Sequence, residues 1–327
     1  MKLLVLVHDT KIWRNIRSWN DHNILQKDIS ALYDWSVKNK MKFHTDKCKV
    51  LAIAPTGKGI DNYLDQIFPF NIFYYHMNDV DLQFVQSEKD LGIVVTSNLS
   101  WVDQLNSLYS KTSCRLGLLK RTLHFIKCPK QKRNFYLAIV RSQFEHCVQI
   151  WRPNNDTYIA KLERIQRRAV KWILAEHDHH YNEVEYINRL KDLDLLPLKY
   201  RFIFSDLTMF YKIYYKISCV TIPEYFKPTS NDDMSTRLRK NIKPPEYLLE
   251  NENINLENLR KTKNDRLSLK CTTEAHSRVF KNSFFFRTVH EWNRVPIEIR
   301  SSETLTLFEG SLKSYIWNQA LYELEPD

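Results

Sequence analysis

The chain has 327 residues, of which 43% are apolar and 13% aromatic, so it can bury a core and is long enough for two domains. This composition excludes a disordered protein, and the 5 glycines form no GxGxxG or GxxxxGK(S/T) pattern, which argues against a glycine-rich phosphate loop. The formal net charge is +11 at pH 7.

The positive charge is concentrated in one window of the sequence. Residues 111–173 contain 15 Lys and Arg against 3 Asp and Glu, a local excess of +12, and the remainder is close to neutral. Such a concentration is typical of a surface that contacts a phosphate backbone. We therefore expect a polyanionic partner.

Cysteine use and hydropathy bear on the compartment. The 6 cysteines are scattered without a CxxC pair, which favours a reduced, intracellular setting and leaves nucleus or cytoplasm open. No apolar run approaches the roughly 18–20 residues of a membrane-spanning helix, so no membrane contact is expected. His124, Cys128, His146 and Cys147 lack the paired spacing of a structural zinc site, so zinc is not expected either.

The first predicted element is a β-hairpin. An apolar run over residues 3–7 stops at His8-Asp9, and a second β-type run resumes over residues 10–13. A carboxylate lifted on such a turn can hold a divalent cation, because Mg²⁺ takes oxygen ligands and uses only one or two protein carboxylates. Asp9 is therefore the candidate metal ligand at this corner.

Further short elements complete a small α+β unit. Apolar residues at positions 25, 29, 32 and 35 predict an amphipathic helix over 21–40, with Asn20 or Asp21 as its N-cap. Short strands are expected at 50–54 and 91–96, and a hairpin at 72–77 and 80–85 around an Asn78-Asp79 turn.

From Trp101 the apolar pattern becomes helical. A long helix is predicted because one face collects positions 101, 105, 108, 112, 116, 119, 123 and 126. Pro129 suits the first turn of the helix that follows. More helices are expected at 156–175, 182–194, 198–218, 274–294 and 304–320. Residues 228–270 are rich in Asn, Lys and Glu and predict a linker.

The first hairpin resembles the aromatic-Ala-Asp-Asp-Thr-Lys hairpin of reverse transcriptases from non-LTR (LINE-like, jockey-type) retrotransposons. His8 takes the place of the first Asp of that motif, and Asp9 takes the place of the second. Four later segments resemble the same family in the same order: residues 34–36 with 41–50, residues 89–92, residues 145–151 with 162–169, and residues 283–287 with 291–296.

The resemblance implies a fold and an activity. Residues 1–98 would be the rear part of a reverse-transcriptase palm, 99–227 a mainly α-helical, thumb-like basic domain, 228–270 a polar linker or insertion, and 271–327 a C-terminal helical element. The family activity is RNA-directed DNA synthesis at a nicked target, with Mg²⁺ as cofactor. Because the match begins partway through the palm, we expect the fingers and the upstream metal-binding Asp to be missing.

The departures from the family motif predict a truncated, inactive enzyme. Phosphoryl transfer needs two metal ions about 3.5–4 Å apart, which takes at least two carboxylates, and Asp9 alone remains as a remnant. No cofactor is therefore expected in this chain. Lys47 resembles the lysine near the incoming triphosphate, although a solvated strand-edge lysine is the preferred interpretation.

The segment at 89–92 has two interpretations that the sequence does not separate. It resembles the primer grip of the family, in which glycine allows close approach of a primer end. A turn before a strand explains it equally well. The residues concerned are Lys89, Asp90, Leu91 and Gly92.

The segment 161–173 is the clearest basic surface. At about 100° per residue, five apolar positions gather on one side and five cations on the other, with Glu163 as the one acid among them. The expected nucleic-acid contacts are Lys161, Arg164, Arg167, Arg168, Lys171, Lys120 and Arg121, with further charge from Lys127, Lys130, Lys132 and Arg133. Binding of RNA or DNA through phosphates would be largely independent of base sequence.

We therefore expect a truncated, catalytically inactive reverse-transcriptase fragment that retains a basic nucleic-acid-binding surface. Two alternatives remain: a non-enzymatic nucleic-acid-binding module adopted by the host, or an element remnant without function.

Overall fold

The computed structural model describes residues 2–6, 9–41, 43–53, 74–175, 182–228, 267–272 and 278–323, and only the backbone at residues 2–6, 9, 228 and 278. The chain divides into two compact units, residues 1–104 and residues 105–327. Helices dominate, and the strands form small two-stranded sheets, which agrees with an α+β class. Most of the predicted linker at 228–270 lies outside the described residues.

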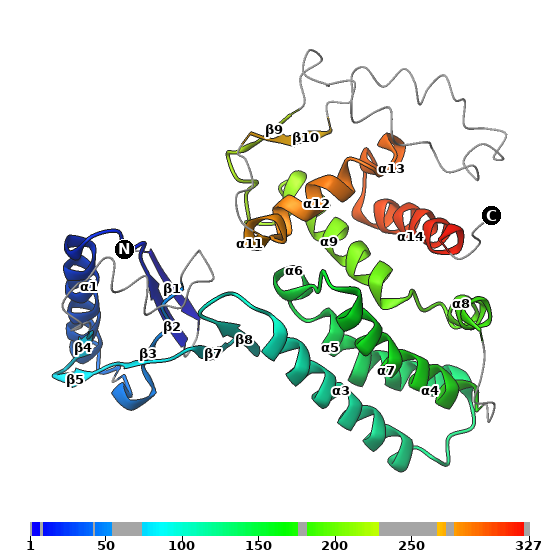
Figure 1. Cartoon of the computed structure of the whole chain (residues 1–327), viewed down its shortest axis with the longest axis horizontal. Helices are drawn as coiled ribbons and strands as arrows, with labels where there is room; N and C mark the ends of the chain where they lie inside the picture. The colour runs from blue at the N-terminus through cyan, green and yellow to red at the C-terminus, as the bar shows by residue number, and fades with distance from the viewer. Residues whose placement is uncertain are drawn as a thin grey trace. The chain divides into compact units, whose positions relative to one another are not determined.

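Unit 1 contains a helix and several short strands (Figure 1). β3 and β6 pair in parallel, and the other pairs β1–β2, β4–β5 and β7–β8 are antiparallel. The elements are β1 (Lys2–Leu6), β2 (Asp9–Trp13), α1 (Trp19–Lys38), a 3₁₀ turn (Thr45–Lys47), β3 (Lys49–Val50), β4 (His76–Met77), β5 (Val80–Asp81), β6 (Gln83–Phe84), β7 (Ser87–Asp90) and β8 (Ile93–Thr96).

Both predicted hairpins of unit 1 are confirmed. β1 pairs with β2 so that Leu6 lies opposite Asp9, and the two loop residues between them lie outside the described residues. β4 and β5 are joined by Asn78 and Asp79, whose φ angles of 53° and 59° are those of a type I′ turn. Among the described residues of unit 1, Ile29, Tyr75, Met77 and Leu82 form a buried hydrophobic cluster.

Helix α1 begins two residues before the predicted start. Its N-cap is Ser18, whose Oγ accepts a hydrogen bond from the Asp21 N–H at 3.3 Å. The Asp21 carboxylate in turn accepts from the Arg17 N–H at 3.1 Å. Asp21 is thus the third helical residue of a reciprocal cap and not the N-cap itself, because the shorter serine reaches the first-turn amides better.

Unit 2 is mainly helical. Its elements are α3 (Val102–Thr122), which starts within unit 1, α4 (Pro129–Tyr136), a π-helical segment (Leu137–Arg141), α5 (Ser142–Glu145), α6 (Val148–Trp151), α7 (Asp156–Leu174), α8 (Glu183–Asp192), α9 (Leu198–Tyr214), β9 (Phe226–Pro228), β10 (Leu269–Cys271), α11 (Arg278–Lys281), α12 (Phe284–Trp292), α13 (Ile297–Arg300) and α14 (Leu305–Tyr322). None of these described helices has the length and hydropathy required to cross a membrane.

The structure confirms the long helices predicted for unit 2, except that one of them is divided in two. On α3 the expected face is buried at Leu105, Leu108, Thr112, Leu116 and Leu119. Pro129 occupies the first turn of α4, as expected. The helix expected at 274–294 is instead two, α11 and α12, separated by a turn at residues 282–283.

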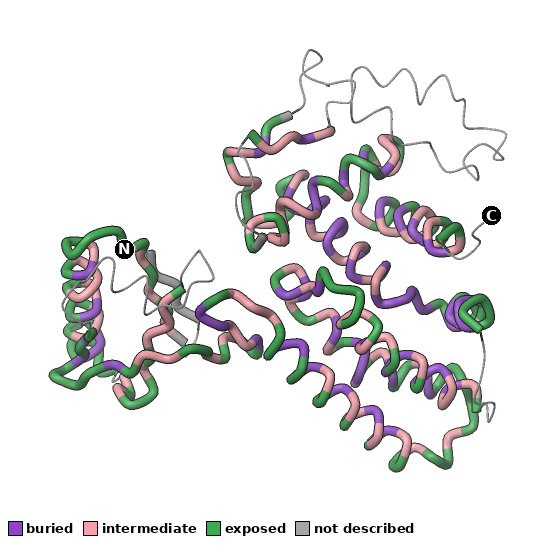
Figure 2. Tube along the Cα trace, in the orientation of Figure 1, coloured by how far each residue is buried: buried purple, intermediate pink, exposed green. Residues whose placement is uncertain are grey.

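Helix α9 is the centre of unit 2. It contacts α12 and α14 on one side and α6 and α7 on the other (Figure 1), and Figure 2 shows buried residues along most of its length. Trp292 and Phe308 pack against Phe210 and Tyr211 of α9. The sequence interpretation treats 271–327 as a separate element, whereas its described helices share one core with α9 because their aromatic residues are buried there.

Candidate nucleic-acid interface

Helix α7 carries the predicted basic face. The helix starts at the N-cap Asn155, whose side chain accepts a hydrogen bond from the Thr157 N–H at 2.9 Å. Its expected apolar side is confirmed, because Leu162, Ile165, Ala169 and Ile173 are fully buried and Trp172 is half-buried. The five cations of residues 161–171 therefore occupy the remaining surface of the helix.

Glu163, the acid expected among these cations, is turned into the protein. Its carboxylate accepts hydrogen bonds from the Tyr186 hydroxyl, from the Leu198 N–H at 2.6 Å and from Gln166 Nε2 at 2.9 Å. Burial raises the pKa of Glu163, and these hydrogen bonds offset only part of that rise. The basic face of α7 is thus free of the negative charge that the helical pattern placed on it.

Two of the cations on α7, Lys161 and Arg167, form polar contacts with residues of neighbouring helices. Lys161 Nζ donates to Asn106 Oδ1 of α3 at 2.9 Å. Arg167 forms an ion pair with Glu183, and its guanidinium lies 3.9 Å from the centre of the Tyr186 ring. These contacts hold α7 against α3 and α8, so Lys161 and Arg167 have a structural role whether or not a ligand is bound.

Three further cations form what we call the cationic cluster, defined as Lys120, Arg168 and Lys171. Arg168 Nη1 donates to Ser113 Oγ of α3 at 3.1 Å, which orients its guanidinium toward that helix. Burial lowers the pKa of Lys120, and repulsion from Arg168 and Lys171 lowers it further. Over the described ranges, neither Lys120 nor Arg168 forms an ion pair with an acid, so their mutual repulsion is uncompensated.

Arg164 and Arg121 are the other two predicted contacts. Both side chains are exposed, and in the part of the chain that the structure describes neither forms an ion pair. Arg164 lies one helical turn before Arg168 on α7, and Arg121 follows Lys120 on α3. They add two exposed cations on the same two helices as the cluster.

Lys132 and Arg133 do not belong to this surface, which corrects the sequence interpretation. Lys132 is buried, and its Nζ donates to the backbone oxygen of Trp172 at 3.0 Å. Arg133 donates to the backbone oxygen of Leu193 and forms an ion pair with Asp194 at 3.4 Å. Both were expected to add positive charge to the basic surface, but these side chains reach carbonyls at the ends of other helices.

The residues with a predicted catalytic role lie in unit 1. Asp9 starts β2, and its side chain lies outside the description. Lys47 is exposed at the end of the 3₁₀ turn before β3. Over the residues that can be searched, no group of three or more His, Cys, Asp or Glu is placed to hold a metal ion.

The segment at 89–92 forms a β-hairpin turn. Lys89 and Asp90 end β7, and Leu91 and Gly92 have φ angles of 47° and 88° before β8 begins. Asp90 forms an ion pair with Lys11 of β2, which ties the two hairpins together. The turn interpretation is confirmed, and a contact with a primer stays a prediction.

A buried charge network joins Arg152, Asp206, Arg287 and Glu291. Arg152 donates to both carboxylate oxygens of Glu291, at 2.9 and 2.6 Å, and to Asp206 at 2.8 Å. Arg287 donates to Asp206 at 2.9 Å and to the backbone oxygen of Gln149 at 2.7 Å. Sequence spacing gives no sign of this network, because its members come from three distant segments. It joins α6, α9 and α12, so these residues have a structural role.

Comparisons with protein-family models, with curated proteins and with solved structures found no match to this chain.

Proposed function

We propose that this chain is a non-catalytic nucleic-acid-binding protein related to the reverse transcriptases of non-LTR retrotransposons. It would bind RNA or DNA through the cationic cluster with Arg164 and Arg121. The observation that supports this proposal is the convergence of Lys120 from α3 with Arg168 and Lys171 from α7. A backbone phosphate placed there would relieve the repulsion and accept charge-assisted hydrogen bonds.

The test compares two triple variants of equal charge. Arg164, Arg168 and Lys171 are changed together to Ala, and in the control Lys191, Lys216 and Lys281, three exposed lysines outside α3 and α7, are changed to Ala. Affinity for a fluorescent oligonucleotide is measured against salt concentration. We expect micromolar binding in the wild type and in the control.

The salt dependence separates phosphate contact from a general charge effect. Each lost phosphate contact should reduce the log–log salt slope by about 0.9 on duplex DNA or about 0.7 on a single strand. The Arg164/Arg168/Lys171 variant should therefore lose up to about 2.7 slope units on duplex DNA or about 2.1 on a single strand, and the control should keep the wild-type slope. Equal losses in both variants, or binding unchanged in the cluster variant, would reject this surface.

The absence of polymerase activity is the second part of the proposal. It rests on His8, which stands where the resemblance places the first metal-binding Asp. Histidine prefers softer metals than Mg²⁺, so a pair of magnesium ions lacks a carboxylate here. Primer extension on an RNA template with Mg²⁺ should stay at the level of an Asp9→Ala variant. Primer extension that depends on Asp9 would overturn the proposed absence of polymerase activity, and the proposal of a nucleic-acid-binding surface would still stand.

A further inference from the structure

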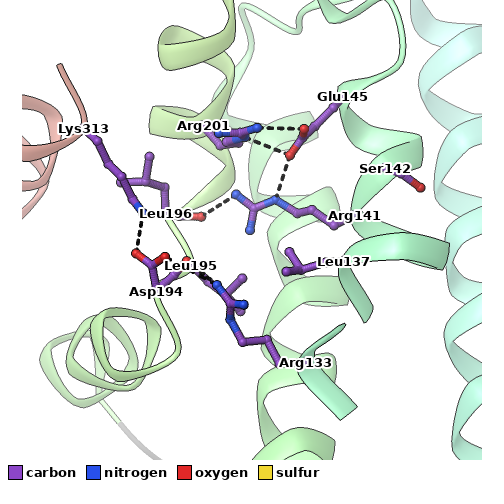
Figure 3. A pocket seen from close by; sticks show the side chains of 10 residues that line it. All are labelled: Arg133, Leu137, Arg141, Ser142, Glu145, Asp194, Leu195, Leu196, Arg201 and Lys313. Atoms are coloured by element: carbon purple, nitrogen blue, oxygen red, sulfur yellow. Dashed lines mark hydrogen bonds and ion pairs between the residues drawn. The ribbon is translucent and has the colours of Figure 1, made fainter. Parts of the chain in front are cut away.

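A cavity of about 300 Å³ lies within unit 2, and no residue of the cationic cluster lines it (Figure 3). Its wall is formed by the end of α4 with the π-helical segment and α5, by the turn before α9, and by α9 and α14. A π-helical turn is rare and is found frequently at functional sites. The charged residues that line the cavity are Arg133, Arg141, Arg201, Lys313, Glu145 and Asp194.

Each carboxylate of the lining is shared by two cations. The Asp194 carboxylate forms ion pairs with Lys313 Nζ at 2.5 Å and with Arg133 Nη2 at 3.4 Å. Figure 3 shows the two cationic side chains approaching Asp194 from opposite sides. The Glu145 carboxylate accepts hydrogen bonds from Nε and Nη2 of Arg201, both at 2.8 Å, and its second cation is Arg141. Four cations therefore face two acids.

Glu145 is ionised in this arrangement. Its burial would raise the pKa, but the hydrogen bonds and the charge of Arg201, together with the charge of Arg141, lower the pKa below its usual value. Counted by formal charge, the four cations and two acids of the lining give a net charge of +2.

Arg141 places one of these charges deep in the protein. The residue is 4% exposed, and its Nη atoms donate to the neutral acceptors Gln166 Oε1 at 2.6 Å and Leu196 O at 3.1 Å. Its Nε lies 3.4 Å from Glu145 Oε1 but makes no hydrogen bond within the described structure. Glu145 is shared with Arg201, and burial raises the pKa of Glu163, the other acid that Arg141 interacts with. Arg141 is therefore incompletely neutralised, which is costly in a low-dielectric environment.

We infer that this cavity is a binding site for a phosphate dianion, either free or as a phosphomonoester. A dianion matches the net charge of +2, whereas the phosphodiester of a nucleic-acid chain carries one negative charge per phosphate. The Lys313 ammonium keeps donors beyond its bond to Asp194, and Arg201 keeps its Nη1 group beyond the two bonds to Glu145. The volume is at the lower end of the range for small-ligand sites.

The first experiment measures binding of inorganic phosphate to the full chain by calorimetry at constant ionic strength. Lys313→Gln removes a cavity cation, and Lys199→Gln is its control, because both lysines are partly exposed and each pairs with one acid. We expect Lys313→Gln to weaken binding about tenfold and Lys199→Gln less than twofold. No saturable binding by the wild type, or equal weakening by both variants, would overturn the inference.

A second variant changes the affinity in the opposite direction. Asp194→Asn raises the net charge of the lining to about +3 while it keeps the shape of the side chain, and asparagine tolerates the φ of 50° at this position. Phosphate should bind this variant several-fold more tightly. Weaker binding in a folded Asp194→Asn protein would contradict an anion site.

The source of the phosphate is resolved with two further probes. A nucleoside 5′-monophosphate represents a free phosphomonoester, and an oligonucleotide with or without a 5′-phosphate represents a chain end. If the 5′-phosphate raises oligonucleotide affinity in the wild type but not in Lys313→Gln, the site takes a terminal phosphate. If only the mononucleotide binds there, the site takes a free ligand. The Arg164/Arg168/Lys171 triple variant should bind inorganic phosphate normally, which makes the two proposals separable.

Discussion

Two glutamates of unit 2 show how neighbouring residues set the ionisation of a buried acid. The donors that hydrogen-bond to Glu163 are neutral, and burial raises its pKa by more than these bonds and the charge of Arg141 lower it. Glu145 is also removed from water, but Arg201 and Arg141 lower its pKa. The difference lies in the charge of the partners and not in the residue type.

The lowered pKa of Glu145 predicts a pH-dependent contribution to stability. Because the folded-state pKa lies below the usual value of 4.5, the stabilisation is fully present above about pH 4.5 and is lost as the pH falls through the folded value. Arg201→Gln should therefore lower the free energy of unfolding most at neutral pH, and the difference from wild type should narrow below pH 4.5. Urea unfolding between pH 3 and pH 7 measures this. A difference that stays constant with pH would contradict the assignment.

Leu91 offers a test of backbone strain at an exposed position. Its φ of 47° is in the left-handed region, which costs a branched L-residue about 1–2 kcal/mol and asparagine less. Leu91→Asn should stabilise the β7–β8 hairpin by about 0.5–1 kcal/mol. Leu118→Asn is the control, since Leu118 is equally exposed, at 53%, but lies in α3. There the substitution should destabilise by a few tenths of a kcal/mol through helix propensity. The same sign at both sites would refute the strain argument.

At the scale of elements, the charge network around Asp206 attaches the C-terminal helices to α9. Asp206 is 0% exposed and pairs with both Arg152 and Arg287. Asp206→Asn leaves two guanidinium groups without their shared anion and should destabilise unit 2 by about 3–5 kcal/mol. Asp192→Asn changes an exposed acid at the end of α8 and should stay within about 0.5 kcal/mol.

The measurement for Asp206→Asn is chemical unfolding followed by tryptophan fluorescence, because Trp151 and Trp292 are fully buried beside the network. A small loss of stability would mean that the network is dispensable for attaching α12. Loss of the predicted amount would show that the network attaches α12 to α9 and α6.

Helix boundaries and helix faces follow largely from local sequence. The apolar period of α3 and α7 predicts which side is buried, because an amphipathic helix has one way to face a core. Pro129 and the Asn78-Asp79 turn were predictable for the same local reason, since their backbone preferences are intrinsic. The N-cap of α1 was predicted at Asn20 or Asp21 but is Ser18 in the structure, because several polar residues near the helix start can compete for the first-turn amides.

At the scale of the whole molecule, the two units differ in the size of their cores. Over the residues that the structure describes, the cluster around Ile29 and Tyr75 in unit 1 is small, whereas unit 2 buries many aromatic residues around α9. We expect amides of the β7–β8 hairpin to exchange with solvent at a lower free energy of opening than those of α9. Native-state hydrogen exchange measures this. Equal protection in both units would show that the chain unfolds as one cooperative body.

Most of the secondary structure and the basic face of α7 are thus readable from sequence, because periodicity and charge are local properties. The inward turn of Glu163, the internal roles of Lys132 and Arg133 and the Arg152–Glu291 pair across 139 residues required the tertiary structure. In each case a long polar side chain finds a partner on another element. Its choice between solvent and that partner depends on distances that no sequence pattern encodes.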